Sequence, residues 1–255
     1  ATSNYVKAEI VPDETLGNKS SVVTNAPPNL KIIDGGLTLD SNLFHSFEKF
    51  DINEQQQAFF INGNGIENII SRVTGNSRSE ILGKLGVIGG NANLFLINPN
   101  GIIFGSNAKL DIGGSFVATT ANAIGFGNQG FFSASVPRTP QLLTVKPSAL
   151  LFNQIASQPI TIKSTTGLQV LANQSLLLVG GDVNLEGGKL SVSGGRIELG
   201  GLAGIGTIGL NIDGSNLLLS YPDDVTQADI SLINKATVNV DSQQSSSEIK
   251  VQGKR

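Results

Sequence analysis

The sequence predicts an all-β fold in which a parallel β-helix forms the body of the molecule. Three observations support this prediction: a seven-residue repeat between Ser175 and Gly201, a high glycine content, and a scarcity of charged residues. Glycine accounts for 31 of the 255 residues, and charged residues make up only 15% of the chain. A helical protein would contain fewer glycines, because each one costs a helix about 1 kcal/mol relative to alanine.

The repeat sets the geometry of the predicted coil. Read in sevens from Ser175, the chain gives SLLLVGG, DVNLEGG, KLSVSGG and RIELGGL, and the last unit ends at Leu202. Within each unit the apolar residues lie two apart, which is typical of a short strand with one buried face. Three strands with glycine corners predict a triangular coil of about 21 residues, stacked on the next coil at about 4.8 Å. The side chains expected to face inward are Leu176, Leu178, Val183, Leu185, Leu190, Val192, Ile197 and Leu199.

Two other folds share part of this pattern. A seven-residue period also occurs in coiled coils, but Gly-Gly in every unit would cost a helix about 2 kcal/mol per repeat. The apolar positions also do not follow the a and d spacing of a coiled coil. An antiparallel meander with Gly-Gly hairpin turns remains the alternative on periodicity alone.

The rest of the chain is less regular. Residues 1–35 are polar, and residues 36–240 are expected to hold the helix. Residues 137–160 contain four of the nine prolines and are predicted to leave the coil. Residues 241–255 form a polar tail that is expected to fray.

Composition excludes several classes of function. The net charge is −3 and the pI is about 5.2, so no basic field is expected to attract nucleic acid or anionic lipid. The longest apolar runs, such as residues 94–97 and 176–179, are too short to cross a bilayer. The absence of cysteine excludes disulfides and thiolate chemistry. Residue 1 is not methionine, which predicts a processed chain such as one that has lost a signal peptide.

Residues 94–105 read as strand, turn and strand around the sequence Asn98-Pro99-Asn100-Gly101. Asparagine first, proline second and glycine fourth match the preferences of a type I β-turn. A tight two-residue hairpin needs a positive φ at its first central position, and proline is fixed near −65°. The turn is therefore predicted to be a corner between two faces of one coil, with asparagine side chains laddering onto neighbouring coils.

The residues around this corner resemble a known family. Residues 91–105 read NANLFLINPNGIIFG and are followed by GGSFVA at 113–118. Both stretches resemble the two-partner secretion domain, also called the haemagglutination activity domain, of filamentous-haemagglutinin-like exoproteins. Residues 42–47 and 66–75 resemble the same family in its cyanobacterial style. The resemblance covers residues 20–240, approximately.

The resemblance implies both a fold and a function. The expected fold is a right-handed parallel β-helix, with an N-terminal β cap over residues 1–35 and small β elements outside the coil. The whole chain, residues 1–255, is then one secretion domain of a large adhesin-like exoprotein. Such domains are recognised by the POTRA domains of an outer-membrane barrel transporter and start β-helix folding at the cell surface. The protein is thus expected to be monomeric and to be secreted or surface-bound after passing through the periplasm, without membrane insertion.

The resemblance also implies functional residues. The secretion motif maps onto Asn98, Pro99, Asn100 and Gly101. Members of the family often carry a second motif, Asn-Pro-Asn-Leu, ahead of the first. Its nearest counterpart here is Asn62, Gly63, Asn64 and Gly65, which lacks both the proline and the leucine.

Other motifs favour ordinary structural explanations. Residues 204–209 match G-x-G-x-x-G, but a strand-and-turn pattern follows where a dinucleotide site needs a helix. His45 is the only histidine, so the chain lacks a histidine cluster for zinc and a partner for a catalytic triad. Asp223 and Asp224 follow Tyr221-Pro222, which is typical of a solvated turn. No catalytic residue, metal site or cofactor is therefore predicted, and the chain is not expected to be an enzyme.

A β-helical protein that binds or degrades carbohydrate is the alternative function. Pectin-degrading β-helices use closely spaced carboxylates, and sugar grooves are commonly lined with aromatic rings. Two tyrosines and no tryptophan provide little stacking surface for sugars.

Overall fold

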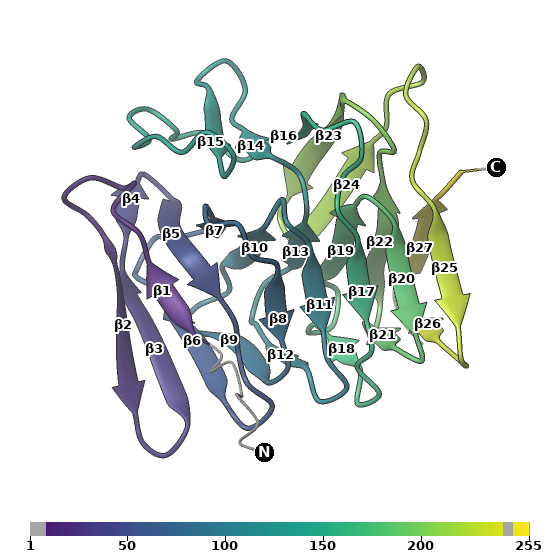
Figure 1. The fold of residues 1–255 in the computed structure, drawn as a ribbon, viewed down its shortest axis with the longest axis horizontal. Coiled ribbons are helices and arrows are strands. Elements are labelled where there is room, and N and C mark those ends of the chain that lie inside the picture. The colour runs from purple at the N-terminus through teal and green to yellow at the C-terminus, as the bar shows by residue number, and fades with distance from the viewer. Residues whose placement is uncertain (1–8, 242–246, 255) are drawn as a thin grey trace, which may run out of the picture.

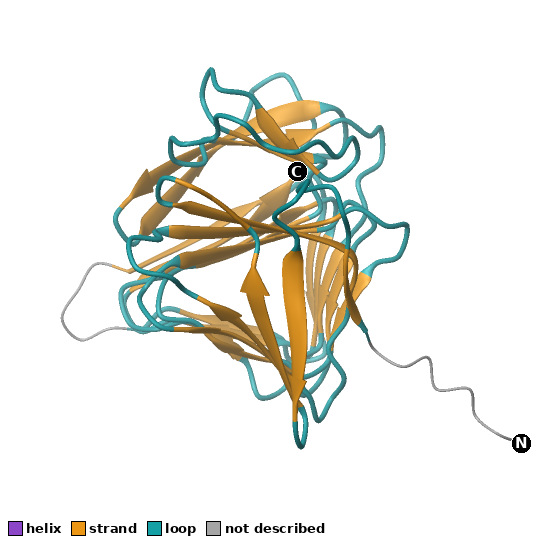
Figure 2. Ribbon diagram, turned by 90° about the vertical axis from the view of Figure 1, so that its left-hand side faces the viewer, coloured by secondary structure: helices purple, strands orange, loops and turns teal. Residues whose placement is uncertain are grey.

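The computed structural model describes residues 9–241 and 247–254, and every regular element in these ranges is a β-strand. The strands stack as successive coils along the long axis of the molecule (Figure 1). Viewed along this axis, the strands form the sides of a triangular prism (Figure 2). The fold is a right-handed parallel β-helix, as the sequence predicts.

One side of the prism is a long sheet, here called sheet A, which runs through all the coils. Its neighbouring strands pair in parallel, apart from antiparallel strands at the N-terminal edge. Sheet A contains, in spatial order, β1 (Ile10–Pro12), β5 (Asn42–Phe50), β7 (Asn68–Val73), β10 (Asn93–Ile97), β13 (Phe116–Thr119), β19 (Ser175–Gly180), β22 (Gly195–Gly201) and β27 (Ser247–Gln252), with β4 (Leu37–Leu39) beside β5.

Shorter sheets form the other two sides. Sheet C is entirely parallel and contains β8 (Ser79–Ile81), β11 (Ile102–Phe104), β17 (Ile160–Ile162), β20 (Val183–Glu186) and β25 (Ile230–Ile233). The third side is divided between sheets B and E. Sheet B contains β2 (Ser21–Ala26), β3 (Leu30–Gly35), β6 (Gln57–Ile61), β9 (Lys84–Ile88) and β12 (Lys109–Asp111), and sheet E contains β18 (Leu168–Gln169), β21 (Lys189–Ser191) and β26 (Thr237–Asn239).

The register confirms the repeat read from the sequence. Leu176 pairs with Ile197 and Leu178 with Leu199, so one coil advances the chain by 21 residues. All eight side chains predicted to face inward belong to the central core and are at most 1% exposed. The antiparallel meander is therefore excluded for this segment.

Glycines at the corners allow the coils to approach each other closely. Gly195 has a φ of +110°, which side chains rarely adopt. A Cβ atom on Gly201 would lie only 1.6 Å from the carbonyl oxygen of Gly180 in the preceding coil. The paired glycines of the repeat therefore meet both a conformational and a steric requirement.

The expectation of a fraying tail is wrong for the part of the tail that the structure describes. Strand β27 pairs in parallel with β22 and begins another coil. The reason is that Ile249 and Val251 alternate within this polar stretch and align with Ile197 and Leu199. Residues 242–246 and 255 of the expected tail lie outside the described residues.

The extra-helical segment differs from the expected excursion at residues 137–160. It starts earlier, directly after Thr119, and a second insertion follows β22. Both insertions run from sheet A to sheet C and together form an antiparallel sheet, sheet D. Prolines mark only the returning half of the first insertion, so composition missed the strands before it. Sheet D contains β14 (Ala123–Gly125), β15 (Phe131–Ser133), β16 (Ala149–Phe152), β23 (Gly206–Asp213) and β24 (Asn216–Ser220).

Sheet D covers the outer face of sheet A and encloses a second core. This core combines outward side chains of sheet A, such as Phe95, Ile97, Leu177 and Val179, with residues from the insertions. Sheet A is therefore buried on both faces. This explains why residues 94–97 and 176–179 are continuously apolar, as is typical of strands covered on both sides.

Candidate functional site

The Asn98–Gly101 turn is a corner between two sides of the prism. It joins β10 of sheet A to β11 of sheet C, so the two strands do not form a hairpin. The backbone N–H of Gly101 donates to the carbonyl oxygen of Asn98 at 3.1 Å, which closes the turn. Gly101 has a φ of +109°, a conformation that favours glycine. The side chain of Asn98 is fully buried.

Both asparagines of the turn bind the corner of the preceding coil. The Asn98 side-chain amide donates to the carbonyl oxygen of Ser77 and to Ser79 Oγ, each at 3.0 Å. Asn98 Oδ1 accepts the backbone N–H of Asn100 at 3.0 Å. The Asn100 amide reaches the carbonyl oxygen of Gly75 at 2.7 Å. The turn is thus fastened to the coil below it, through backbone carbonyls and a serine rather than through other asparagines.

The same turn supports the first extra-helical insertion. The Asn98 N–H donates to the carbonyl oxygen of Thr119 at 3.0 Å, where the chain leaves the coil. The N–H of Ile102, directly after the turn, donates to the carbonyl oxygen of Pro159 at 3.3 Å, where the chain returns. Thr120 Oγ1 then donates to the carbonyl oxygen of Gln158 at 2.7 Å and joins the two ends of the insertion. The corner therefore binds the chain at both ends of the first insertion.

The structure does not bring the second candidate motif to this corner. Asn62, Gly63, Asn64 and Gly65 form a turn between β6 of sheet B and β7 of sheet A, at a different edge of the prism. The N–H of Ile66 donates to the carbonyl oxygen of Gly63 at 3.3 Å. The backbone of Asn62 is bound to the next coil through the carbonyl oxygen of Ile88 at 2.9 Å.

An asparagine ladder does occur, but it joins the first residues of strands β5, β7 and β10 in sheet A. The Asn68 amide donates to Asn42 Oδ1 and the Asn93 amide to Asn68 Oδ1, each at 3.1 Å. At its N-terminal end, the Asn42 amide donates to the carbonyl oxygens of Leu143 at 3.0 Å and Val145 at 2.8 Å, both in the first insertion. The signal was present in the sequence, because each asparagine directly precedes an apolar run, at spacings of 26 and 25 residues.

Arg72 joins three separate parts of the molecule, and sequence reasoning missed it. Its guanidinium is fully buried on the outer face of sheet A. Nε donates to Ser46 Oγ at 2.9 Å, and Nη2 donates to Thr15 Oγ1 at 2.7 Å near the N-terminus. Nη1 and Nη2 donate to the carbonyl oxygens of Ser133 at 2.9 Å and Arg138 at 3.1 Å in the first insertion.

Two features compensate for burying this charge. The guanidinium lies over the ring of Phe132, 4.1 Å from its centre. Burial lowers the pKa of Arg72 to about 10, while the nearby Asp13 opposes the shift. Burial also acts to raise the pKa of Asp13, but hydrogen bonds from Thr74, Thr15 and Ser46 hold that pKa below its usual value. Arg72 therefore stays charged at neutral pH.

The other residues considered in the sequence analysis lie in surroundings that indicate structural roles. His45 is fully buried beside Phe47 and Phe60, and its Nδ1 lies 3.0 Å from Ser21 Oγ. Asp223 and Asp224 are exposed, and residues 204–209 lead into strand β23 rather than a helix. Within residues 9–241 and 247–254 there is no group of three or more His, Cys, Asp or Glu placed to hold a metal ion. The same residues include no helix long and apolar enough to cross a membrane.

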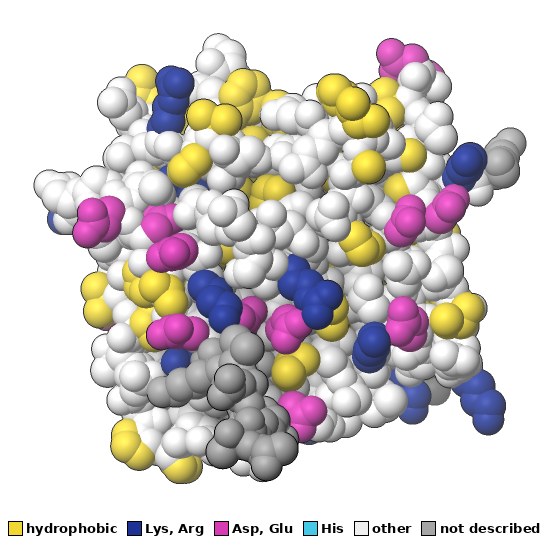
Figure 3. All heavy atoms as spheres, in the orientation of Figure 1, with side chains coloured by type: hydrophobic (Ala, Val, Ile, Leu, Met, Phe, Trp, Pro, Cys, Tyr) yellow, Lys and Arg dark blue, Asp and Glu magenta, His cyan; other side chains and the backbone are white. Residues whose placement is uncertain are grey.

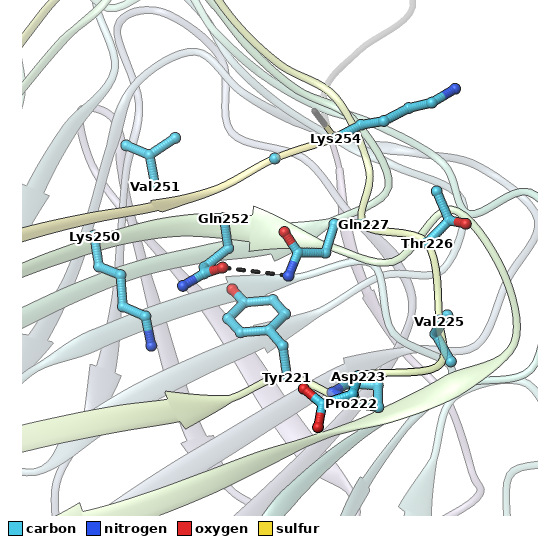
Figure 4. Close-up of a pocket in the computed structure, with 11 residues that line it drawn as sticks. Tyr221, Pro222, Asp223, Val225, Thr226, Gln227, Lys250, Val251, Gln252 and Lys254 are labelled. Atoms are coloured by element: carbon cyan, nitrogen blue, oxygen red, sulfur yellow. Dashed lines mark hydrogen bonds between the residues drawn. The ribbon is translucent and has the colours of Figure 1, made fainter.

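A hollow of about 1000 Å³ lies beside Tyr221 near the C-terminal end of the β-helix (Figure 4). Gln227 Nε2 donates to Gln252 Oε1 at 3.2 Å, the dashed line in Figure 4. Burial raises the pKa of the Tyr221 hydroxyl, and Asp223 is the single carboxylate among the described lining residues. One carboxylate does not supply the acid and base pair that glycoside hydrolysis needs.

Comparisons with known proteins identify one matching family model and several similar proteins. Residues 8–254 match the family described as TPS secretion domain. The chain is 30% identical over 139 residues to the heme/hemopexin-binding protein of Haemophilus influenzae, a match that covers 50% of this chain and 15% of that protein. Its fold is similar to the HMW1 secretion domain of Haemophilus influenzae, with a TM-score of 0.61, 24% identity, and coverage of 96% of this chain and 57% of that one. The filamentous hemagglutinin secretion domain gives a TM-score of 0.45 at 13% identity, over 95% of this chain and 99% of that one.

Proposed function

Because the chain belongs to the two-partner secretion (TPS) domain family, we propose that POTRA domains of an outer-membrane barrel transporter recognise it. We further propose that it initiates β-helix folding of a large exoprotein at the cell surface. Proteins of this family are exoproteins that cross the outer membrane with a cognate transporter. The chain spans 15% of the length of its curated relative, so the activity of the whole exoprotein is outside this proposal.

The burial of the Asn98–Gly101 corner is the observation that carries the proposal. Asn98 and Pro99 are buried in the folded domain, and the side-chain amide of Asn98 is engaged with Ser77 and Ser79. A partner that contacts these side chains therefore binds them before the coil forms. The transporter accordingly recognises an unfolded periplasmic chain, captured as an added β-strand.

The position of the corner gives folding a direction. A β-helix grows when one coil templates the next, since the free edge of each coil presents unpaired backbone groups. The corner binds the coil before it and both ends of the first insertion. We infer that it forms before that insertion is fastened. Growth outside the cell then retains each coil already formed and biases movement outward.

Refolding in the presence of isolated cognate POTRA domains tests this proposal. We expect the domains to retain the chain when it is diluted from urea and to slow its refolding several-fold. The folded chain, added at the same concentration, serves as the matched control and should not be retained. Retention of the folded chain alone, with no effect on refolding, would contradict recognition of the unfolded state.

Carbohydrate binding remains the second candidate, and the hollow beside Tyr221 is the observation in its favour. The hollow has several polar side chains in its lining, among them two glutamines, two lysines and one carboxylate, but it provides only one aromatic ring for stacking. Sugar recognition usually combines a stacking surface with several convergent polar groups. The corner geometry and the family therefore support the export role better.

A further inference from the structure

The first extra-helical insertion exposes an unusual amount of apolar surface. Phe131 is 60% exposed, Val136 62% and Leu142 69%, and Val145 is exposed as well. Monomeric proteins rarely present large apolar side chains together unless the surface has a binding role. In Figure 3, hydrophobic side chains gather along the upper edge of the molecule, over the strands of sheet D.

A specific set of hydrogen bonds holds this surface in place. Gln129 Nε2 donates to Thr144 Oγ1 at 3.0 Å. Gln129 Oε1 accepts the backbone N–H groups of Thr144 at 2.8 Å and Val145 at 3.0 Å. The segment next to Phe131 is therefore fixed against the segment next to Leu142. These hydrogen bonds order the part of the insertion that carries Phe131, Leu142 and Val145.

The charge of this part of the chain has one sign. No aspartate or glutamate occurs between Asp111 and Asp182, whereas Arg138, Lys146 and Lys163 lie within that interval. Arg138 and Lys146 are both exposed; Arg138 lies between Val136 and Leu142 in the sequence, and Lys146 directly follows Val145. The net charge of −3 for the whole chain, which predicted no attraction to anionic lipid, conceals this local distribution.

We propose that six exposed side chains of the first insertion, here called the tip, dock onto an anionic lipid surface: Phe131, Val136, Leu142, Val145, Arg138 and Lys146. Exposed apolar side chains that protrude with neighbouring cations fit the boundary between headgroups and acyl chains. The acid-free composition favours a partner rich in negative charge. An anionic lipid surface repels the acidic remainder of the chain, and this repulsion orients the tip toward the lipid. The inference goes beyond the export role and does not depend on it.

Vesicle co-sedimentation of residues 1–255 tests the proposal. We expect binding to vesicles that contain phosphatidylglycerol and weak binding to pure phosphatidylcholine. The double variant Phe131→Asn/Leu142→Asn should reduce the partition coefficient about ten-fold, because two apolar side chains no longer leave water. Arg138→Gln/Lys146→Gln should produce a similar loss on phosphatidylglycerol, and added salt should reproduce it.

Leu171→Asn is the matched control. Leu171 is 59% exposed but lies between β18 and β19, at the corner between sheets E and A. This variant should bind phosphatidylglycerol vesicles as the unsubstituted chain does. Absence of binding to phosphatidylglycerol, or equal binding by all variants, would overturn the proposal. Self-association without lipid that Phe131→Asn/Leu142→Asn abolishes would also overturn it, since the tip would then contact a second copy of the chain.

Discussion

Arg72→Met is expected to lower the free energy of unfolding by about 3–5 kcal/mol, the usual effect of removing one partner from a buried charged network. Methionine has a suitable length but cannot donate hydrogen bonds. The carbonyl oxygens of Ser133 and Arg138 would lose their donors from Arg72. Asp13, whose charge faces Arg72, would lose a compensating cation.

The segments in which hydrogen exchange accelerates test the role of Arg72 more sharply than the total loss of stability does. Hydrogen exchange should accelerate together at residues 13–17 and 131–138, because Arg72 binds both segments. Urea denaturation provides the total free energy. Arg78→Met is the matched control: its side chain is 57% exposed and pairs with Glu80, so its cost should stay below about 1 kcal/mol. Equal losses in the two variants would contradict the coupling assigned to Arg72.

Acidification is expected to destabilise the domain through His45. Burial lowers the pKa of His45 from 6.5 to about 3, with Asp34 opposing the shift, so the folded state holds the ring neutral. The unfolded chain therefore binds more protons than the folded chain between pH 6.5 and pH 3. Stability that is present above pH 6.5 is thus lost as the pH falls, at up to about 1.4 kcal/mol per pH unit.

A comparison with His45→Gln isolates this effect. Between pH 6.5 and pH 4.5, the unsubstituted chain should lose about 2–3 kcal/mol more than the variant, measured by urea denaturation at each pH. This range avoids pH values below 4, where the lowered pKa of Asp13 removes further stability as that carboxylate becomes protonated. Parallel pH profiles for the two proteins would refute the assignment to His45.

The coil could be predicted from the sequence because its determinants are local. Each seven-residue unit contains both the alternating apolar residues of a strand and a pair of glycines. Residues 175–201 therefore specify which side chains face inward and that one coil contains 21 residues. The Asn98–Gly101 corner was predictable for the same reason, since proline excludes a tight hairpin. Its bonds to the coil below, however, span 19 to 25 residues and were not visible in the turn itself.

Sheet D and Arg72 could not be predicted because they depend on distant pairings. Strand β16 pairs with β23, which comes from a different insertion. Arg72 is an isolated arginine in the sequence; Ser46 lies 26 residues away, and its partners in the N-terminal and insertion segments lie 57 to 66 residues away. The continuous apolar runs of sheet A are typical of strands that are covered on both faces, but they do not identify the segment that covers them.

We propose that the Asn98–Gly101 corner acts in export in addition to its structural role. Asn98→Ile and Asn100→Ile each remove hydrogen bonds to the preceding coil and should cost about 1–2 kcal/mol. Ile197→Val is the control, since it removes one core methylene in a later coil and should cost about 0.5–1.5 kcal/mol. Thermal melting of each purified variant establishes that the three losses are comparable.

Secretion of these variants by cells that carry the cognate transporter is the decisive measurement. We predict that secretion falls at least about ten-fold for Asn98→Ile and Asn100→Ile and stays normal for Ile197→Val. Normal secretion of both asparagine variants, or losses in all three that follow stability alone, would contradict the claim.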